Sequence, residues 1–391
     1  MPPESPVSTP PVRPSAPDLA RKSSRMTPPD YTPPPERINI DETSVSMKSL
    51  PNMQIMNEQG ELSPDWPHPD LSPEELLKIH RAMVLTRVLD QRMLTMQRQG
   101  QMGTFAPGYG QEATQIGQVL PLKTNDWFSP SYRSFGAQLW RGWTIEGLML
   151  LWDGYAEGFT IPEGVNDLPF SIVIGSHVPT AVGLAMAAKR SGDDSVALVN
   201  FGDGALSQGI VSEALNFAAV DQAPVIFICE NNGYAISTPV QKQAHNQVLA
   251  LRGLGCDIPS LRIDGNDIFA MIQATTDAAN RARSGGGPTF IEVITYRISL
   301  HTTADDPSVY RDDAEVEQWK KRDPLLRFQI GLLHLCLAQG RGQLHIVDEL
   351  SQGSDQRRGA RLVRPRYRLA DNDIRQFRVQ PGSLGRVEFQ H

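Results

Sequence analysis

Residues 195–204 read SVALVNFGDG and residues 224–234 read PVIFICENNGY, and these two stretches decide the fold. Each begins with a nearly continuous apolar run, which is typical of a strand buried on both faces of a parallel sheet. Residues 205–230 separate the two polar loops, which is enough chain for one helix and the returning strand. One βαβ unit therefore predicts that both loops lie at the same edge of the sheet.

The surrounding sequence continues this alternation of strands and helices. A long helix is predicted from Pro73 to about Gly100, because Ser72 suits the N-cap position and Glu75 follows it by three residues. Further expected segments are apolar runs at 171–174 and 289–296 and helices at 179–190, 209–220 and 267–283. The pattern predicts an α/β fold, a parallel sheet with helices on both faces, which binds ligands beyond the carboxyl ends of its strands.

The two polar loops have the chemistry of a magnesium diphosphate site. Mg²⁺ prefers about six hard oxygen ligands, some of them supplied by phosphates. Asp203 offers a carboxylate, Asn232 an amide oxygen and Tyr234 a backbone carbonyl, while Gly202 and Gly204 let the backbone approach a phosphate. Each loop alone is an ordinary turn sequence. Their joint placement after two buried strands is what favours a site.

Gly-Asp-Gly followed by Asn-Asn at this spacing is similar to the thiamine diphosphate motif. The chain also resembles the alpha subunit of the decarboxylating component of 2-oxo acid dehydrogenase complexes. The segments that carry this resemblance are MQIMNEQGEL (53–62), LTRVLDQRMLTMQRQGQMG (85–103), GQEA (110–113), PEGVN (162–166), NNGYAISTPVQKQ (231–243) and HTTADDPSVYR (301–311). The resemblance covers about residues 53–328. It implies the thiamine diphosphate-binding fold of the transketolase and 2-oxo acid dehydrogenase type.

The resemblance also implies a role for individual residues. The Mg²⁺ ligands would be Asp203, Asn232 and the Tyr234 carbonyl. The other cofactor contacts would come from Gly204 and Ala205 through their backbone, from Tyr132 and Arg133 at the diphosphate, and from backbone groups of Ile172 and Ile174 at the aminopyrimidine ring.

His301 matches the active-site histidine of the family and is expected to contact both cofactor and substrate. The residues expected to order its loop are Arg297, Asp305, Tyr310 and Arg311. Thr302 matches the place where animal relatives carry a regulatory phosphoserine.

The activity implied is oxidative decarboxylation of a small 2-oxo acid, with thiamine diphosphate and Mg²⁺, and acyl transfer to the lipoyl domain of the acyltransferase component. A beta subunit is expected as partner in an α/β heterotetramer, because in this family it carries the carboxylate that activates the cofactor. PEGVN and AISTPVQKQ favour pyruvate as substrate, while ITYRIS and HTTADDPSVYR favour a branched-chain acid such as 2-oxoisovalerate. The same motifs are also compatible with an acetoin dehydrogenase alpha subunit and with a non-catalytic scaffold subunit.

The two ends of the chain differ in composition from its middle. Twelve of the 31 prolines lie in residues 1–36, so we predict a disordered extension over 1–50. The cofactor-binding domain is expected over 51–328. An atypical tail follows at 329–391, and residues 322–391 contain twelve Arg and no Lys. Within the tail, RRGARLVRPRYR (357–368) is open to three interpretations: a solvated segment, a basic patch for nucleic acid, or the product of a frameshift.

Overall composition argues against several classes of protein. The formal net charge of −7 disfavours electrostatic capture of nucleic acid or of an anionic membrane, so neither is expected as a partner. The sequence has no uncharged apolar window of membrane-spanning length. Its three cysteines are widely spaced, which predicts a reducing, cytoplasmic location and no disulfide framework.

Overall fold

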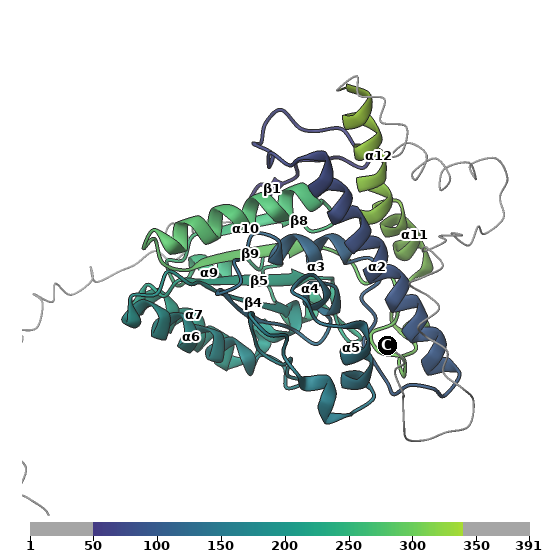
Figure 1. Ribbon diagram of the computed structural model, residues 1–391, viewed down its shortest axis with the longest axis horizontal. Coiled ribbons are helices and arrows are strands. Elements are labelled where there is room, and N and C mark those ends of the chain that lie inside the picture. The colour runs from purple at the N-terminus through teal and green to yellow at the C-terminus, as the bar shows by residue number, and fades with distance from the viewer. Residues whose placement is uncertain (1–49, 339–391) are drawn as a thin grey trace, which may run out of the picture. The chain divides into compact units, whose positions relative to one another are not determined.

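The computed structural model describes residues 50–338, whose centre is a seven-stranded parallel sheet (Figure 1). Across the sheet the strands are β1 (Asn52–Met53), β8 (Ser260–Asp264), β9 (Thr289–Ile294), β5 (Val225–Asn231), β4 (Ala197–Gly202), β2 (Trp127–Ser129) and β3 (Asn166–Asp167). Each neighbouring pair is parallel. A separate antiparallel pair consists of β6 (Tyr234–Ala235) and β7 (Thr238–Pro239). The predicted fold class is confirmed.

Different helices cover the two faces of the sheet. In β5, Val225, Phe227 and Cys229 pack with α6 and α7, whereas Ile226 and Ile228 pack with helices of the opposite face. This alternation follows from the two-residue period of a strand, and it explains why the run is apolar throughout. Figure 1 shows the two layers, α6 (His177–Ser191) and α7 (Gly209–Asp221) on one side, and α2 (Pro73–Arg98), α3 (Glu112–Val119), α10 (Ile268–Arg283) and α12 (Pro324–Ala338) on the other.

Helix α2 begins as its sequence predicts. The Ser72 hydroxyl accepts from the Glu75 amide, and the Glu75 carboxylate accepts from the Ser72 amide at 2.8 Å, which completes a capping box. Farther along α2, Leu89 and Met93 pack in a separate apolar cluster. Its other members come largely from α4 (Phe135–Trp140) and α5 (Ile145–Trp152), so these two short helices are held by the end of α2.

Several elements were not predicted, and most of them are short. Strands β1, β2, β3 and β8 have two to five residues each, too few for a clear hydrophobic period. The apolar run at 171–174 is not a strand but a series of bends, and its side chains are largely exposed. The remaining short elements are η1 (Ala156–Phe159), η2 (Asp203–Ser207), α8 (Val240–Gln243), α9 (Leu251–Leu254), η3 (Pro307–Val309) and α11 (Asp313–Lys320).

Predictions about the two ends lie largely outside the described residues. All of the predicted extension over 1–50 except residue 50 lies outside the described residues, as does the whole basic segment 357–368. Helix α12 runs past the expected domain boundary at 328 and reaches Ala338. The domain boundaries therefore stay predictions.

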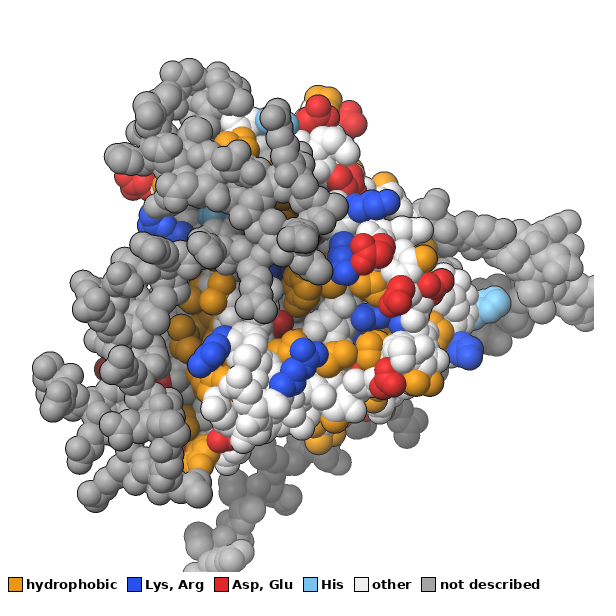
Figure 2. Space-filling model, turned by 90° about the vertical axis from the view of Figure 1, so that its right-hand side faces the viewer, with side chains coloured by type: hydrophobic (Ala, Val, Ile, Leu, Met, Phe, Trp, Pro, Cys, Tyr) orange, Lys and Arg blue, Asp and Glu red, His pale blue; other side chains and the backbone are white. Residues whose placement is uncertain are grey.

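The described surface is of mixed character. No helix between residues 50 and 338 combines the length and hydrophobicity needed to cross a bilayer. On the face in Figure 2, where grey atoms do not cover it, Lys and Arg side chains lie among acidic and apolar ones. That visible surface has no continuous basic patch of the kind that binds nucleic acid.

Candidate active site

Strands β4 and β5 bring the two predicted loops together. The strands are parallel neighbours, with Gly202 opposite Glu230 and α7 as the crossover. Asp203 and Asn232 therefore emerge at the same edge of the sheet, and only 3% and 7% of their surfaces are exposed. The backbone of Asn232 also acts on the Asp203 carboxylate and lowers its pKa. The predicted βαβ placement is confirmed.

The Asp203 carboxylate is held by a side chain that the sequence did not point to. Gln243 Nε2 donates to Asp203 Oδ2 at 2.6 Å and to the Thr238 carbonyl at 2.8 Å. Burial raises the pKa of Asp203, and the bond from Gln243 opposes that rise. A cation bound here would favour the ionised carboxylate in the same way. Gln243 Oε1 is buried and has no hydrogen-bond partner.

Position 204 has no room for a side chain. A β-carbon built there would lie 2.7 Å from Ala235 Cβ, closer than two carbon atoms tolerate. At Gly202 the nearest heavy atom would be 3.9 Å away, so the crowding is specific to Gly204. Ala205 follows in the same short turn and is buried. Glycine at position 204 therefore lets this turn pack closely against Ala235.

Tyr234 is the third predicted metal ligand, through its backbone carbonyl. It lies opposite Pro239 in the two-stranded ribbon, next to the pair in which the Val240 amide donates to the Gly233 carbonyl, so its own carbonyl is directed away from the partner strand. Gly233 precedes it with φ of +87°, a left-handed conformation that glycine adopts readily. Asn232 Oδ1 accepts from the Tyr234 amide at 3.3 Å. The two loops thus supply a carboxylate, an amide oxygen and a carbonyl.

This donor set fits a cation shared with a diphosphate. Within residues 50–338, no group of three or more His, Cys, Asp or Glu side chains is arranged to hold a metal. Asp203 is the one carboxylate in the predicted set, so Mg²⁺ would need additional oxygens to reach its usual coordination. Phosphate oxygens next to Gly204 would complete that shell. A metal bound by protein groups alone does not fit.

His301 follows β9 and is held by two arginines. Arg297 Nη1 donates to His301 Nδ1 at 2.7 Å, and Arg133 Nη2 lies 3.3 Å from the same atom. Burial, aided by the charges of Arg133 and Arg297, lowers the pKa of His301 to about 3. Because Nδ1 accepts, the neutral ring carries its proton on Nε2 and can donate a hydrogen bond from there.

Tyr132 and Arg133 lie beside this histidine. The ring centroids of Tyr132 and His301 are 6.3 Å apart in an edge-to-face arrangement. Arg133 is buried, donates to the His301 carbonyl at 3.0 Å, and is hydrogen-bonded to the Pro107 carbonyl. The structure therefore brings these three predicted residues together, although they come from segments far apart in the sequence.

A dense set of hydrogen bonds orders the loop around His301. Asp305 Oδ2 accepts from the His301 amide at 2.9 Å and from the Tyr310 hydroxyl at 2.5 Å. Arg311 donates to three successive backbone carbonyls at the start of the loop, those of Arg297, Ile298 and Ser299. Thr302 lies in a turn closed by the Asp305 amide. The expected ordering residues are all in contact with the loop.

Ile172 and Ile174 lie in the bends before α6, with 61% and 41% of their surfaces exposed. A β-carbon at the neighbouring Gly175 would lie 3.0 Å from Val211 of α7. The segment is therefore next to the start of α7, the helix that follows the Asp203 turn. Its exposed apolar side chains are free to contact a ligand or another chain.

A buried polar network at this edge was missed from the sequence. Glu230 Oε1 accepts from Gln118 Nε2 at 3.0 Å and from Asn200 Nδ2 at 2.7 Å, and burial raises the pKa of Glu230. Asn200 Oδ1 accepts from the Ser131 amide at 2.7 Å. The network ties β4 and β5 to the loop that carries Tyr132 and Arg133. The available signal was a polar residue inside each apolar strand.

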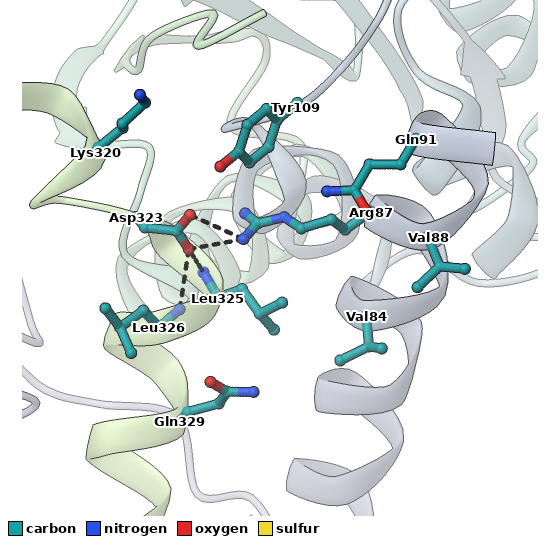
Figure 3. Close-up of a pocket in the computed structure, with 10 residues that line it drawn as sticks. All are labelled: Val84, Arg87, Val88, Gln91, Tyr109, Lys320, Asp323, Leu325, Leu326 and Gln329. Atoms are coloured by element: carbon teal, nitrogen blue, oxygen red, sulfur yellow. Dashed lines mark hydrogen bonds and ion pairs between the residues drawn. The ribbon is translucent and has the colours of Figure 1, made fainter. Parts of the chain in front are cut away.

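A cavity of about 260 Å³ lies between α2 and α12, apart from these residues (Figure 3). Arg87 is its main charged group, and it donates to Asp323 at 2.8 Å and, through Nε and Nη2, to both oxygens of Glu112 at 2.8 Å. Figure 3 shows the Arg87 guanidinium turned toward Asp323. Since Arg87 is already paired with Asp323 and Glu112, we interpret its role as structural: it fixes the GQEA segment (110–113) against α2 and α12.

Comparison with known proteins shows which family the chain resembles. A family model described as the dehydrogenase E1 component matches residues 80–349. A pyruvate dehydrogenase E1 component subunit alpha from Acholeplasma laidlawii is 44% identical over 284 residues, which are 72% of this chain and 80% of that protein. The protein of the same name from Staphylococcus aureus (strain Mu50) is 43% identical over 278 residues, covering 71% of this chain and 75% of that protein.

Proposed function

The chain belongs to the dehydrogenase E1 component family, and we propose that it is the alpha subunit of a pyruvate dehydrogenase that uses thiamine diphosphate and Mg²⁺. The observation that carries the chemistry is the meeting of Asp203 and Asn232 at the ends of β4 and β5. Pyruvate is favoured over a branched-chain acid because the relatives from Acholeplasma laidlawii and Staphylococcus aureus are both named for pyruvate.

The cofactor would be held by the two loops. Asp203, Asn232 and the Tyr234 carbonyl would bind Mg²⁺, while Gly204 and Ala205 would contact the diphosphate through their backbone. Tyr132 and Arg133 would reach it from the neighbouring loop, and a guanidinium suits phosphate because its donors form a fork. When bound, thiamine diphosphate supplies the electron sink that decarboxylation of a 2-oxo acid requires.

His301 would act as a neutral hydrogen-bond donor. Its Nδ1 is occupied by the two guanidinium groups, so Nε2–H is the group available to the substrate oxygen or to the diphosphate. Arg133 and Arg297 orient the ring and oppose its protonation. This arrangement favours stabilisation of developing negative charge on the substrate rather than full proton transfer from an imidazolium.

A beta subunit is the proposed partner in an α/β heterotetramer, and the lipoyl domain of the acyltransferase component the proposed acceptor. Exposed large apolar side chains support a protein partner: Ile172, Val173 and Ile174 in the bends, Ile210, Phe217 and Val220 on α7. Backbone groups of Ile172 and Ile174 would hold the aminopyrimidine ring where the partner closes the site. A cytoplasmic location remains part of this proposal.

Co-expression with a beta subunit tests the assignment. The pair is expected to reduce an artificial electron acceptor with pyruvate, and the alpha chain alone is expected to be inactive. If the pair turns over 2-oxoisovalerate or acetoin faster than pyruvate, the proposed substrate is 2-oxoisovalerate or acetoin instead. Full activity of the alpha chain by itself would overturn the two-chain proposal.

Asp203→Ala separates an enzyme from a non-catalytic scaffold with the same fold. The substitution is expected to weaken thiamine diphosphate binding to the co-expressed pair, because it removes the charged metal ligand. Glu317→Ala, an exposed position on α11, serves as the matched control. Unchanged affinity in Asp203→Ala would favour a scaffold role for the chain.

A further inference from the structure

The side chain of Tyr234 leaves the predicted metal loop and reaches a distant helix. Its hydroxyl donates to Glu315 Oε2 of α11 at 2.7 Å, across 81 residues of sequence. By contrast, the hydrogen bonds within the loop are long: the Gly233 amide lies 3.2 Å from Asn231 Oδ1, and the Tyr234 amide 3.3 Å from Asn232 Oδ1. The bond to Glu315 is therefore the short, charge-assisted contact that fixes Tyr234.

An aromatic cluster extends this contact along α11. The ring of Tyr234 lies 5.8 Å from that of Tyr310 and 6.4 Å from that of Tyr296, measured between centroids. Tyr296 in turn stacks on Trp319, with centroids 5.1 Å apart and planes inclined by 6°. Glu315 and Trp319 are four residues apart, so they project from the same side of the helix. Helix α11 thus makes two contacts with one cluster.

The same cluster reaches the loop of the active-site histidine. Tyr310 donates to Asp305, and Asp305 accepts from the His301 amide. Arg297 Nη2 donates to the Tyr310 hydroxyl at 3.1 Å while its Nη1 donates to the His301 ring. Helix α11 therefore adds a connection between the metal loop after β5 and the histidine loop after β9. These two strands are neighbours, and their loops also meet where Arg297 donates to the Ile236 carbonyl at 3.1 Å.

We propose that Glu315 is a positioning residue for the metal: by holding the Tyr234 hydroxyl, it aims the Tyr234 backbone carbonyl at Mg²⁺. The carbonyl is suited to this task because the Tyr234–Pro239 pair lies next to the pair in which the Val240 amide donates to the Gly233 carbonyl, so the ribbon does not use the Tyr234 carbonyl. The inference rests on the proposed function, since it assigns a role toward a metal held with thiamine diphosphate. A carbonyl that is free to rotate would lose the pre-organisation that Mg²⁺ coordination demands.

The experiment uses the co-expressed alpha and beta chains and measures thiamine diphosphate binding by calorimetry at a series of Mg²⁺ concentrations. Glu315→Ala and Tyr234→Phe are each expected to raise the Mg²⁺ concentration needed for half-maximal binding about tenfold, the effect of losing one charge-assisted hydrogen bond. Glu315→Gln keeps an acceptor oxygen and is expected to restore most of the Mg²⁺ affinity. Glu317→Ala, exposed on the same helix and paired with Lys320, is the control.

The double variant Tyr234→Phe/Glu315→Ala distinguishes positioning from general destabilisation. If one hydrogen bond carries the effect, the double variant requires no more Mg²⁺ than either single variant. Single variants that titrate like the wild type would overturn the proposal, as would additive losses in the double variant. If Glu315→Ala fails to fold, the Glu315→Gln and Tyr234→Phe pair still tests it. Wild-type chains that bind thiamine diphosphate without any need for Mg²⁺ would instead contradict the proposed function.

Discussion

Replacing Asp90 with Asn is expected to change how the stability of the chain depends on pH. Asp90 lies on α2 with 2% of its surface exposed, and its carboxylate accepts from the Gly108 amide at 2.7 Å. Burial raises the pKa of Asp90 from 3.8 to about 7, and the Glu112 charge adds to the rise while Arg133 and Arg87 oppose it. The folded chain therefore binds this proton more tightly than the unfolded chain does.

The sign and size of the effect follow from this difference. A carboxyl whose pKa is raised by folding stabilises the protein below its unfolded pKa, and that contribution is lost as the pH rises through the folded pKa. The window thus runs from about pH 4 to about pH 7. Asn cannot ionise, yet its Oδ1 can still accept from Gly108. Between pH 5 and pH 8, Asp90→Asn should gain about 3 kcal/mol of unfolding free energy relative to the wild type.

Urea denaturation of the full chain at pH 5, 6, 7 and 8 measures this gain. Glu317→Gln, which removes an exposed carboxylate paired only with Lys320 at the surface, is the matched control and should track the wild type. The reasoning is refuted if the difference in unfolding free energy between Asp90→Asn and the wild type is the same at every pH.

Three further predictions concern the site and its surroundings. Gly204→Ala should lower the free energy of unfolding by about 1–3 kcal/mol and weaken thiamine diphosphate binding, because the new methyl group would clash with Ala235. Gly183→Ala is the control, since a β-carbon there meets nothing within 4 Å, and it should change neither stability nor binding. Equal behaviour of the two variants in denaturation and calorimetry would contradict the prediction. His301 should keep the ring-nitrogen NMR shifts of a neutral Nε2–H tautomer from pH 8 to pH 5. An imidazolium signal in that range would contradict the conclusion that Arg133 and Arg297 keep the ring neutral. Phe217→Asp should abolish co-purification with the beta subunit while leaving the stability of the alpha chain unchanged. Leu261→Asp, at another exposed apolar position on β8, should leave co-purification intact. Retained co-purification of Phe217→Asp would show that α7 is not part of the interface.

The sequence predicted the parts of the site that depend on local pattern. Asp203 and Asn232 directly follow apolar runs, and parallel topology alone then places them at one edge. The capping box of α2 was equally local, because both of its partners lie within four residues. In contrast, the apolar run at 171–174 proved to be largely exposed. An apolar run that faces a ligand or another chain cannot be distinguished from core by hydropathy alone.

The contacts missed from the sequence are those made between distant segments. Gln243 holds Asp203 from a short helix forty positions later, and Glu315 holds Tyr234 from eighty-one positions later. Gln243 and Glu315 lie where polar residues are ordinary, so the sequence did not single them out. Asn200 is unusual because it is a polar residue inside an apolar strand, and it proved to be the centre of a buried network that ends at the Tyr132–Arg133 loop. A polar residue in a predicted core strand is thus the signal to follow.

The charges around His301 connect the protein to its cofactor. Arg133 and Arg297 both oppose protonation of His301, and their guanidinium groups reach its ring from segments far apart in the sequence. Arg133 is also the residue proposed to reach the diphosphate. An anionic diphosphate near Arg133 would offset part of its positive charge and so raise the pKa of His301 from its value in the cofactor-free chain. The direction of that change is measurable by comparing His301 in the two states. A pKa that falls on cofactor binding would mean that the diphosphate does not lie next to Arg133.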